Sequence, residues 1–231
     1  MQSPKLFTNA WFERVFDTLA WDIVARVLFV VSFGWIARSA AAGLIAVWHS
    51  RTPDGLIWLA MAIRTLGVVN TSIPILIVIF RRRAIARLHG FGPKIVALGG
   101  TFLPIALFLL PYHPSSAATT LISGTLLVAG GTLALWTWPH LGRSYSLMAE
   151  ARKLKTDGPY RLVRHPLYLF EEINIVGIYL FFISPIATLI LAVQIGCQLL
   201  RIRNEEQVLS STFPEYREYQ KTTSKLIPGV Y

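Results

Sequence analysis

Charged residues are scarce in this chain. Asp, Glu, Lys and Arg make up 15% of its 231 residues, whereas an average soluble domain has about 25%. Hydrophobic residues make up 54%, and the mean hydropathy is +0.52. This balance argues against a soluble domain and indicates that lipid is the solvent for much of the surface.

Cysteine is almost absent, since Cys197 is the single one. An intrachain disulfide and a cysteine-based zinc site are therefore excluded. Cys197 lies in an apolar segment, where we expect it to pack against its neighbours. The sequence predicts no metal site.

Long apolar runs predict an all-α membrane protein. Four candidate spans, each close to the ~20 residues that a bilayer requires, are Ile23–Trp48, Leu56–Phe80, Ile95–Tyr112 and Ala117–Trp138. A fifth apolar region, Leu167–Leu200, is too long for one span and contains Ser184-Pro185 near its middle. Because proline breaks a helix, we interpret this region as a hairpin of two short helices, which gives about six transmembrane helices.

Basic residues are distributed asymmetrically between the loops. With both termini placed in the cytoplasm, 18 of the 22 Lys and Arg residues fall in cytoplasmic segments. By the positive-inside rule this bias predicts cytoplasmic N- and C-termini, in either a bacterial inner membrane or the endoplasmic reticulum. The net charge of +10 is explained by topology, and since no nucleic-acid-binding motif accompanies it, we expect no nucleic-acid partner.

Two arginines, Arg38 and Arg64, lie within predicted spans. A charged side chain inside a bilayer costs about 2.5–3.5 kcal/mol on insertion scales. We therefore expect both side chains to face the bundle interior or a polar cavity.

The segment from Gly158 to Tyr168 is dense in polar, aromatic and proline residues. Gly158-Pro159 predicts a turn, and Pro166 can begin a helix while keeping His165 out of helical geometry. The free N–H groups at that helix start could receive a polar or anionic ligand group. The alternative is that these residues only anchor the chain at the membrane surface.

A second polar stretch begins at Arg201 and contains Glu205-Glu206. Arg201 and Glu205 are four residues apart and share a helix face. Adjacent carboxylates at a membrane boundary are unusual, and a cationic ligand would explain them; a solvated helix face is the alternative. The hairpin begins and ends on the cytoplasmic side, so we expect the His165 region and the glutamate pair to face each other across a nucleoside-sized hollow.

Together these motifs resemble the isoprenylcysteine carboxyl methyltransferase family, integral-membrane enzymes related to the phospholipid N-methyltransferases. The residues that carry the resemblance are Leu141–Ser146, Leu154–Tyr168, Arg201-Ile202-x-x-Glu205-Glu206, Tyr216-x-x-Tyr219 and Ile227-Pro228. The resemblance implies one integral-membrane domain over residues 1–231, with four generic spans in 1–138 and a methyltransferase core in 139–231.

The resemblance also implies roles for individual residues. S-adenosylmethionine would be bound by Leu154, Gly158, Pro159, Tyr160, Arg164, His165, Pro166, Tyr168, Glu205 and Glu206. Arg201 and Glu205 would be catalytic, with Arg201 orienting the acceptor or pairing with Glu205. His165 would bind the cofactor rather than act as a base. Phe170 departs from the family, which usually has glycine there.

The implied reaction is methyl transfer to a lipophilic acceptor, the carboxylate of a prenylcysteine-like substrate, which enters sideways from the bilayer. A phospholipid or small-molecule N-methyltransferase is an alternative. So is an NADPH-dependent sterol-type reductase, whose C-terminal ends resemble residues 226–231. The third alternative is a non-catalytic membrane scaffold that binds no cofactor.

Overall fold

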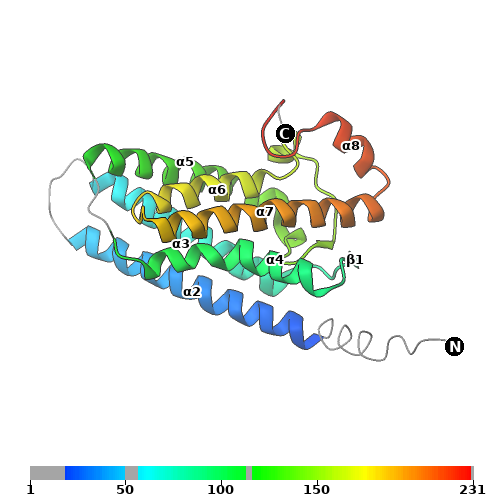
Figure 1. Cartoon of the computed structure of the whole chain (residues 1–231), viewed down its shortest axis with the longest axis horizontal. Helices are drawn as coiled ribbons and strands as arrows, with labels where there is room; N and C mark the ends of the chain where they lie inside the picture. Colours follow the sequence, from blue (N-terminus) through cyan, green and yellow to red (C-terminus); the bar gives the residue numbers. More distant parts are fainter. Residues whose placement is uncertain (1–18, 50–56, 113–115, 230–231) are drawn as a thin grey trace.

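The computed structural model describes residues 19–49, 57–112 and 116–229 (Figure 1). Its α-helices are α2 (Leu19–His49), α3 (Ile57–Phe80), α4 (Phe91–Phe102), α5 (Ala117–Leu141), α6 (Pro166–Tyr179), α7 (Pro185–Thr212) and α8 (Tyr216–Thr222). Three 3₁₀ helices, η1 (Leu103–Leu109), η2 (Gly142–Ser144) and η3 (Gly158–Arg161), and two short strands, β1 (Ala86–Arg87) and β2 (Glu150–Ala151), complete the described elements.

Local sequence sets the ends of the long helices. Ser116 caps α5, because its hydroxyl accepts a hydrogen bond from the Thr119 N–H, and Gly142 ends that helix with a positive φ of 49°. Ser184 caps α7 in the same way through the Ala187 N–H, and Pro185 occupies the first helical position. The proline that predicts a break in the last apolar region thus begins a helix.

The long helices lie side by side as a bundle (Figure 1). The pairs α2–α3, α3–α5, α5–α6 and α4–α7 pack against each other. Glycine permits a close approach between α5 and α6, since a Cβ on Gly130 would lie 2.9 Å from the Phe170 carbonyl oxygen. Phe170, the departure from the family pattern, is buried in the core with Trp138 and Phe29.

The prediction of an all-α membrane protein is confirmed. Five described helical segments are long and apolar enough to cross a bilayer, whereas α6 has only 14 residues. The hairpin of α6 and α7 is present, but the prediction that both its helices are short is wrong, because α7 has 28 residues. The helix continues beyond the apolar stretch through Arg201, Ile202 and Glu206, which are buried against neighbouring segments.

The prediction that Arg38 and Arg64 face the bundle interior is also wrong, because both side chains are exposed. Arg38 lies on α2, which packs mainly against α3 at one edge of the bundle (Figure 1). The Arg64 guanidinium lies over Gly43 of α2, where a Cβ would come within 2.8 Å of it. The Arg64 side chain therefore lies along the surface of α2 rather than inside the bundle.

The polar connections gather at one end of the bundle, where β1, α8 and the described end of the C-terminal tail lie (Figure 1). Strand β1 pairs with β2 in antiparallel register, so that Ala86 lies opposite Ala151. The backbone N–H groups of Ile85 and Leu88 donate to the carbonyls of Ala151 and Ala149 at 2.7 and 3.0 Å. This pairing joins the loop before α4 to the segment between α5 and α6.

Candidate functional site

The start of α6 is fixed by the C-terminal tail. His165 precedes the helix with φ −126° and ψ 59°, and Pro166 is the first helical residue. The N–H groups of Arg164 and His165 donate to the carbonyls of Ser224 and Lys225 at 2.8 and 3.0 Å. These backbone hydrogen bonds hold the C-terminal tail beside the segment that precedes α6, although the two are far apart in sequence.

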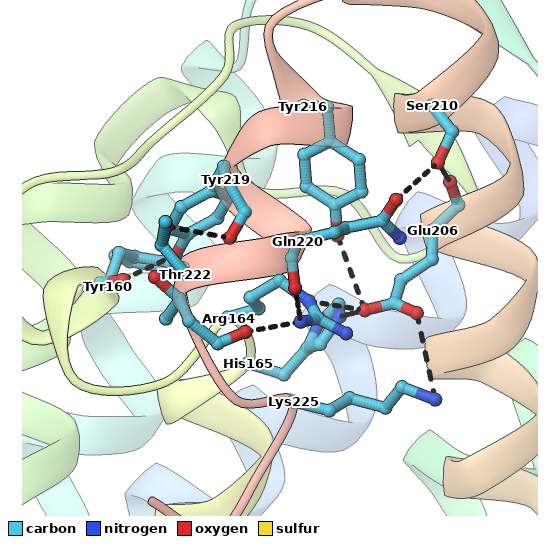
Figure 2. Close-up of polar contacts among 11 residues, drawn as sticks. Tyr160, Arg164, His165, Glu206, Ser210, Tyr216, Tyr219, Gln220, Thr222 and Lys225 are labelled. Carbon is cyan, nitrogen blue, oxygen red and sulfur yellow. Dashed lines mark hydrogen bonds and ion pairs between the residues drawn. The ribbon is translucent and has the colours of Figure 1, made fainter. Parts of the chain in front are cut away.

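Glu206 is the centre of a polar cluster that Figure 2 shows. Its Oε1 accepts from Arg164 Nε at 2.8 Å and from Tyr216 OH at 3.4 Å, and it lies 3.3 Å from His165 Nε2. Lys225 Nζ lies 3.7 Å from Oε2. The His165 region and Glu206 are therefore in direct contact, not on opposite sides of a hollow, and three basic side chains surround this carboxylate.

Glu205 has different partners. Tyr168 OH donates a hydrogen bond to Glu205 Oε1, and Arg201 Nε lies 3.5 Å from the same oxygen. The Arg201 guanidinium lies 4.8 Å from the centre of the Tyr168 ring. It also donates to Thr101 Oγ1 at 3.1 Å and to the Ser146 carbonyl at 3.2 Å, and the residue is only 2% exposed.

A cavity lies beside Glu205 at the polar end of the bundle. It contains about 710 Å³ of space, part of it open to solvent. Its lining residues come from three stretches, the first being Leu141, Ser144, Tyr145, Ser146, Met148, Glu150, Arg152, Lys153, Leu154 and Lys155. The others are Tyr160, Arg164, His165, Leu167 and Tyr168, then Glu205, Leu209, Tyr216 and Tyr219.

Another part of the cavity wall contains a buried ion pair. Arg152 Nη2 donates to Glu150 Oε2, and the Ser146 hydroxyl donates to the same oxygen at 2.6 Å. Burial lowers the pKa of the Arg152 guanidinium, and the Glu150 carboxylate opposes that shift. Arg152 Nε is buried and has no hydrogen-bond partner among the described residues.

Two tyrosines of α8 complete the cavity. Tyr219 OH donates to the Tyr160 carbonyl, while Tyr216 is 1% exposed and contacts Glu206. Burial raises the pKa of both phenols and of Tyr160. The three hydroxyls therefore stay protonated and remain donors at neutral pH.

The cavity includes part of the residue set that the sequence suggested. Leu154, Tyr160, Arg164, His165, Tyr168 and Glu205 line it. Gly158, Pro159, Pro166, Arg201 and Glu206 are close in space but are not lining residues. Gly158 makes a turn with φ +59°, Pro166 begins α6, and Arg201 and Glu206 lie behind the wall.

The segment from Ser144 to Lys155 forms part of the cavity wall, but the sequence predicted a site role only for Leu154 within it. Arg152, Lys153 and Lys155 are among the basic residues that predict the topology, and no role was predicted for Glu150. A usable signal was present, because Glu150 and Arg152 are opposite charges in an otherwise apolar chain. Tyr216 and Tyr219 of α8 are part of the family resemblance but were given no site role, and both line the cavity.

The fold and the cavity define a multi-helix membrane protein with a polar, tyrosine-rich site at one end of its bundle. The pattern of the phospholipid methyltransferase family matches residues 118–216. This match covers α5 to the start of α8 and confirms the resemblance to membrane methyltransferases, since that family is related to the isoprenylcysteine carboxyl methyltransferases.

Two curated proteins are similar to this chain. The cobalt-zinc-cadmium resistance protein CzcN of Cupriavidus metallidurans is 38% identical over 76 residues, covering 32% of this chain and 35% of that protein. The nickel-cobalt-cadmium resistance protein NccN of Alcaligenes xylosoxydans xylosoxydans is 35% identical over 114 residues, covering 47% and 53%. The similarity thus spans only about a third to a half of these relatives' length.

Proposed function

We propose that the cavity binds S-adenosylmethionine and that the chain transfers a methyl group to a lipophilic acceptor. The observation that carries this proposal is the Glu205 carboxylate in a cavity with five tyrosines, Tyr145, Tyr160, Tyr168, Tyr216 and Tyr219. A carboxylate and aromatic faces suit a cationic centre. When bound, the cofactor supplies an electrophilic methyl group on a positively charged sulfonium.

The residues of this chain would mainly bind and align the reactants. Tyr168 and Arg201 hold the Glu205 carboxyl group in a fixed position. The tyrosine side chains restrict the access of water, and alignment in such a site can supply about 7–11 kcal/mol of the barrier. Arg201 is buried and occupied by protein partners, so we assign it the positioning of Glu205 rather than contact with the acceptor.

The acceptor that we propose carries a carboxylate, as in a prenylcysteine-like compound. Arg152, Lys153 and Lys155 line the cavity and place three basic side chains in its wall. A carboxylate held by these cations is already a nucleophile, so its oxygen can attack the methyl carbon without a general base. An amine acceptor, which the phospholipid methyltransferase match favours, would instead release a proton, and Glu205 is the carboxylate placed to take it.

We also propose the orientation of the chain in the membrane. The end of the bundle that contains the cavity carries Arg82, Arg83, Arg87, Arg143 and Arg161. Basic residues favour the cytoplasmic side, so cofactor would enter from the cytoplasm. The acceptor would arrive from the bilayer.

A contribution to metal resistance is a second candidate, which the names of the two relatives favour. Over the ranges that the structure covers, no group of three or more His, Cys, Asp and Glu side chains could hold a metal ion. We therefore propose that any such contribution would act through methyl transfer. Growth in the presence of cadmium or nickel, with a gene deletion complemented by the wild type or by Glu205→Gln, tests this.

Methyl transfer is tested with purified protein, radiolabelled S-adenosylmethionine and separate acceptors, a prenylcysteine and a phosphatidylethanolamine. Alkali releases the label from a methyl ester but not from a methylamine. We expect alkali-labile label, with a higher KM for the acceptor in Arg152→Gln. Arg87→Gln is the matched control, because Arg87 contacts Glu150 at 3.8 Å without lining the cavity. Alkali-stable label would replace the carboxylate acceptor with an amine, and no transfer to any acceptor would contradict methyl transfer.

A further inference from the structure

A polar cluster lies between α6 and α7, separate from the cavity. Glu171 and Glu172 project from α6, and Gln194 and Gln198 project from α7. Gln194 Nε2 donates to Glu172 Oε1 at 2.7 Å, and the Gln198 amide hydrogen-bonds to Glu171. None of these four residues lines the cavity.

Helix α4 closes this cluster on a third side. Gln194 Nε2 lies 3.5 Å from the Gly100 carbonyl oxygen. A Cβ on Gly100 would come within 2.9 Å of Gln198 Oε1. The absence of a side chain at Gly100 therefore leaves room for both glutamine amides between the three helices.

The cluster has more hydrogen-bond acceptors than donors. Glu172 Oε2, Gln194 Oε1 and Gln198 Oε1 are buried and have no partner in the part of the chain that the structure describes. Gln194 is fully buried and Gln198 is 3% exposed. The amide orientation is set by the carboxylates, since each NH₂ group must donate to its glutamate. The three orphaned atoms are all oxygens, so what would satisfy them is a donor or a positive charge.

Charge in the cluster is also unbalanced. Among the described residues, Arg201 is the cation that faces Glu171. Its Nε lies 3.5 Å from Glu205 Oε1 and has no hydrogen-bond partner among those residues. The other titratable neighbours, Tyr145 and Tyr168, are neutral phenols. One guanidinium therefore faces both Glu171 and Glu205, while Glu172 has the neutral Gln194 amide as its partner. Uncompensated carboxylates are costly inside a bundle that lies in lipid.

We propose that Glu172 and the carbonyl oxygens of Gln194 and Gln198 bind one small positive charge, a sodium ion or a proton. Oxygen ligands suit a hard cation. The bound charge would link α6 to α7, and these helices carry Tyr168 and Glu205 into the cavity. This site is independent of methyl transfer, because its ligands lie outside the cavity.

The test is thermal unfolding in detergent at constant ionic strength, with sodium chloride exchanged for choline chloride, at about pH 6 and about pH 8. For a sodium site, we expect sodium to raise the wild-type Tm at the higher pH by about 3 °C or more. For a proton site, the lower pH would give that rise with no sodium dependence. Glu172→Gln should remove either response, because its amide brings the missing donor without a charge.

A second test variant, Gln194→Leu, is compared with two control variants, Gln207→Leu and Glu218→Gln. Gln194→Leu removes a ligand, whereas Gln207→Leu changes an exposed glutamine of the same helix. Glu218→Gln removes a carboxylate that is 72% exposed. Size-exclusion profiles identify any variant that does not fold. Equal sodium and pH responses in the wild type, Glu172→Gln and Gln194→Leu would overturn the proposal, whatever the outcome for cofactor binding.

Discussion

The Arg164 guanidinium lies 2.8 Å from the Glu206 carboxylate, and this contact joins the start of α6 to the last part of α7 (Figure 2). The same guanidinium donates through Nη1 to the backbone carbonyls of Gln220 and Thr223. One arginine thus connects both helices of the hairpin with α8 and the tail that follows it. The wall of the cavity depends on this connection.

We expect Arg164→Ala to lower the free energy of unfolding by about 3 kcal/mol, because it leaves a largely buried carboxylate without its main partner. Lys221→Ala is the control, since the Lys221–Glu218 pair is more than 70% exposed and its loss should cost less than about 0.5 kcal/mol. Denaturant titration in detergent, followed by tryptophan fluorescence, measures both. Similar losses in the two variants would show that the Arg164 contact does not stabilise the fold.

The two adjacent glutamates should respond differently to the same substitution. Glu206→Gln leaves Arg164, His165 and Lys225 around a neutral amide, so we expect a clear loss of stability, of about 1–3 kcal/mol. In Glu205→Gln the amide keeps an acceptor for Tyr168, and Arg201 keeps the nearby Glu171 carboxylate, so we expect a smaller loss of stability than in Glu206→Gln. If Glu205→Gln were the less stable variant in the same denaturant titration, the division between a structural and a cavity-facing carboxylate would be wrong.

Gly158 should tolerate no side chain. Its φ of +59° disfavours other residues by about 1–2 kcal/mol, and a Cβ would lie 2.1 Å from the His140 ring. We expect Gly158→Ala to lower the Tm, and to do so less when His140→Ala is present as well. A double-mutant cycle measures this coupling. Strictly additive effects would mean that the His140 contact is unimportant.

Alkaline pH should destabilise the cavity end of the molecule. Burial raises the pKa of Tyr160, Tyr216 and Tyr219 above the value of 10.0 that an exposed phenol has. The folded state therefore holds these protons more tightly than the unfolded state does. Their contribution to stability is fully present below about pH 10 and is lost as pH rises further.

Absorbance of tyrosinate, recorded together with tryptophan fluorescence, tests this. The buried phenols should ionise only as the protein unfolds, and Tyr219→Phe should reduce the alkaline loss. Full ionisation of all eight tyrosines in the folded protein would contradict the burial of this group.

Hydropathy and local signals predicted the fold class and most helix positions. The 3.6-residue spacing also predicted that Arg201 and Glu205 share a face of α7, where they lie 3.5 Å apart. The position at which α7 ends could not be predicted from hydropathy or helical spacing. The helix remains buried beyond its apolar part because the tail and the segment around Ser146 pack against it, and those contacts are remote in sequence.

The same limit applies to the site. The sequence brought Arg164, His165 and Glu206 to one neighbourhood, but it did not show that Glu206 is surrounded by cations while Glu205 faces the cavity. That difference depends on α8 and Lys225, which pack against Glu206 in the folded chain. The strands β1 and β2 are two residues each, which is too short for any alternating pattern, so the wall that contains Glu150 and Arg152 gave no periodic signal.

Isothermal titration of the detergent-solubilised protein with S-adenosylhomocysteine is the most direct test that the cavity is a methyltransferase cofactor site. The wild type should bind this ligand and not NADPH, and Glu218→Gln should bind it equally well. For S-adenosylmethionine itself, Glu205→Gln should weaken binding by about tenfold, which corresponds to about 1.4 kcal/mol. Binding of NADPH alone, or of no nucleotide ligand, would contradict the account.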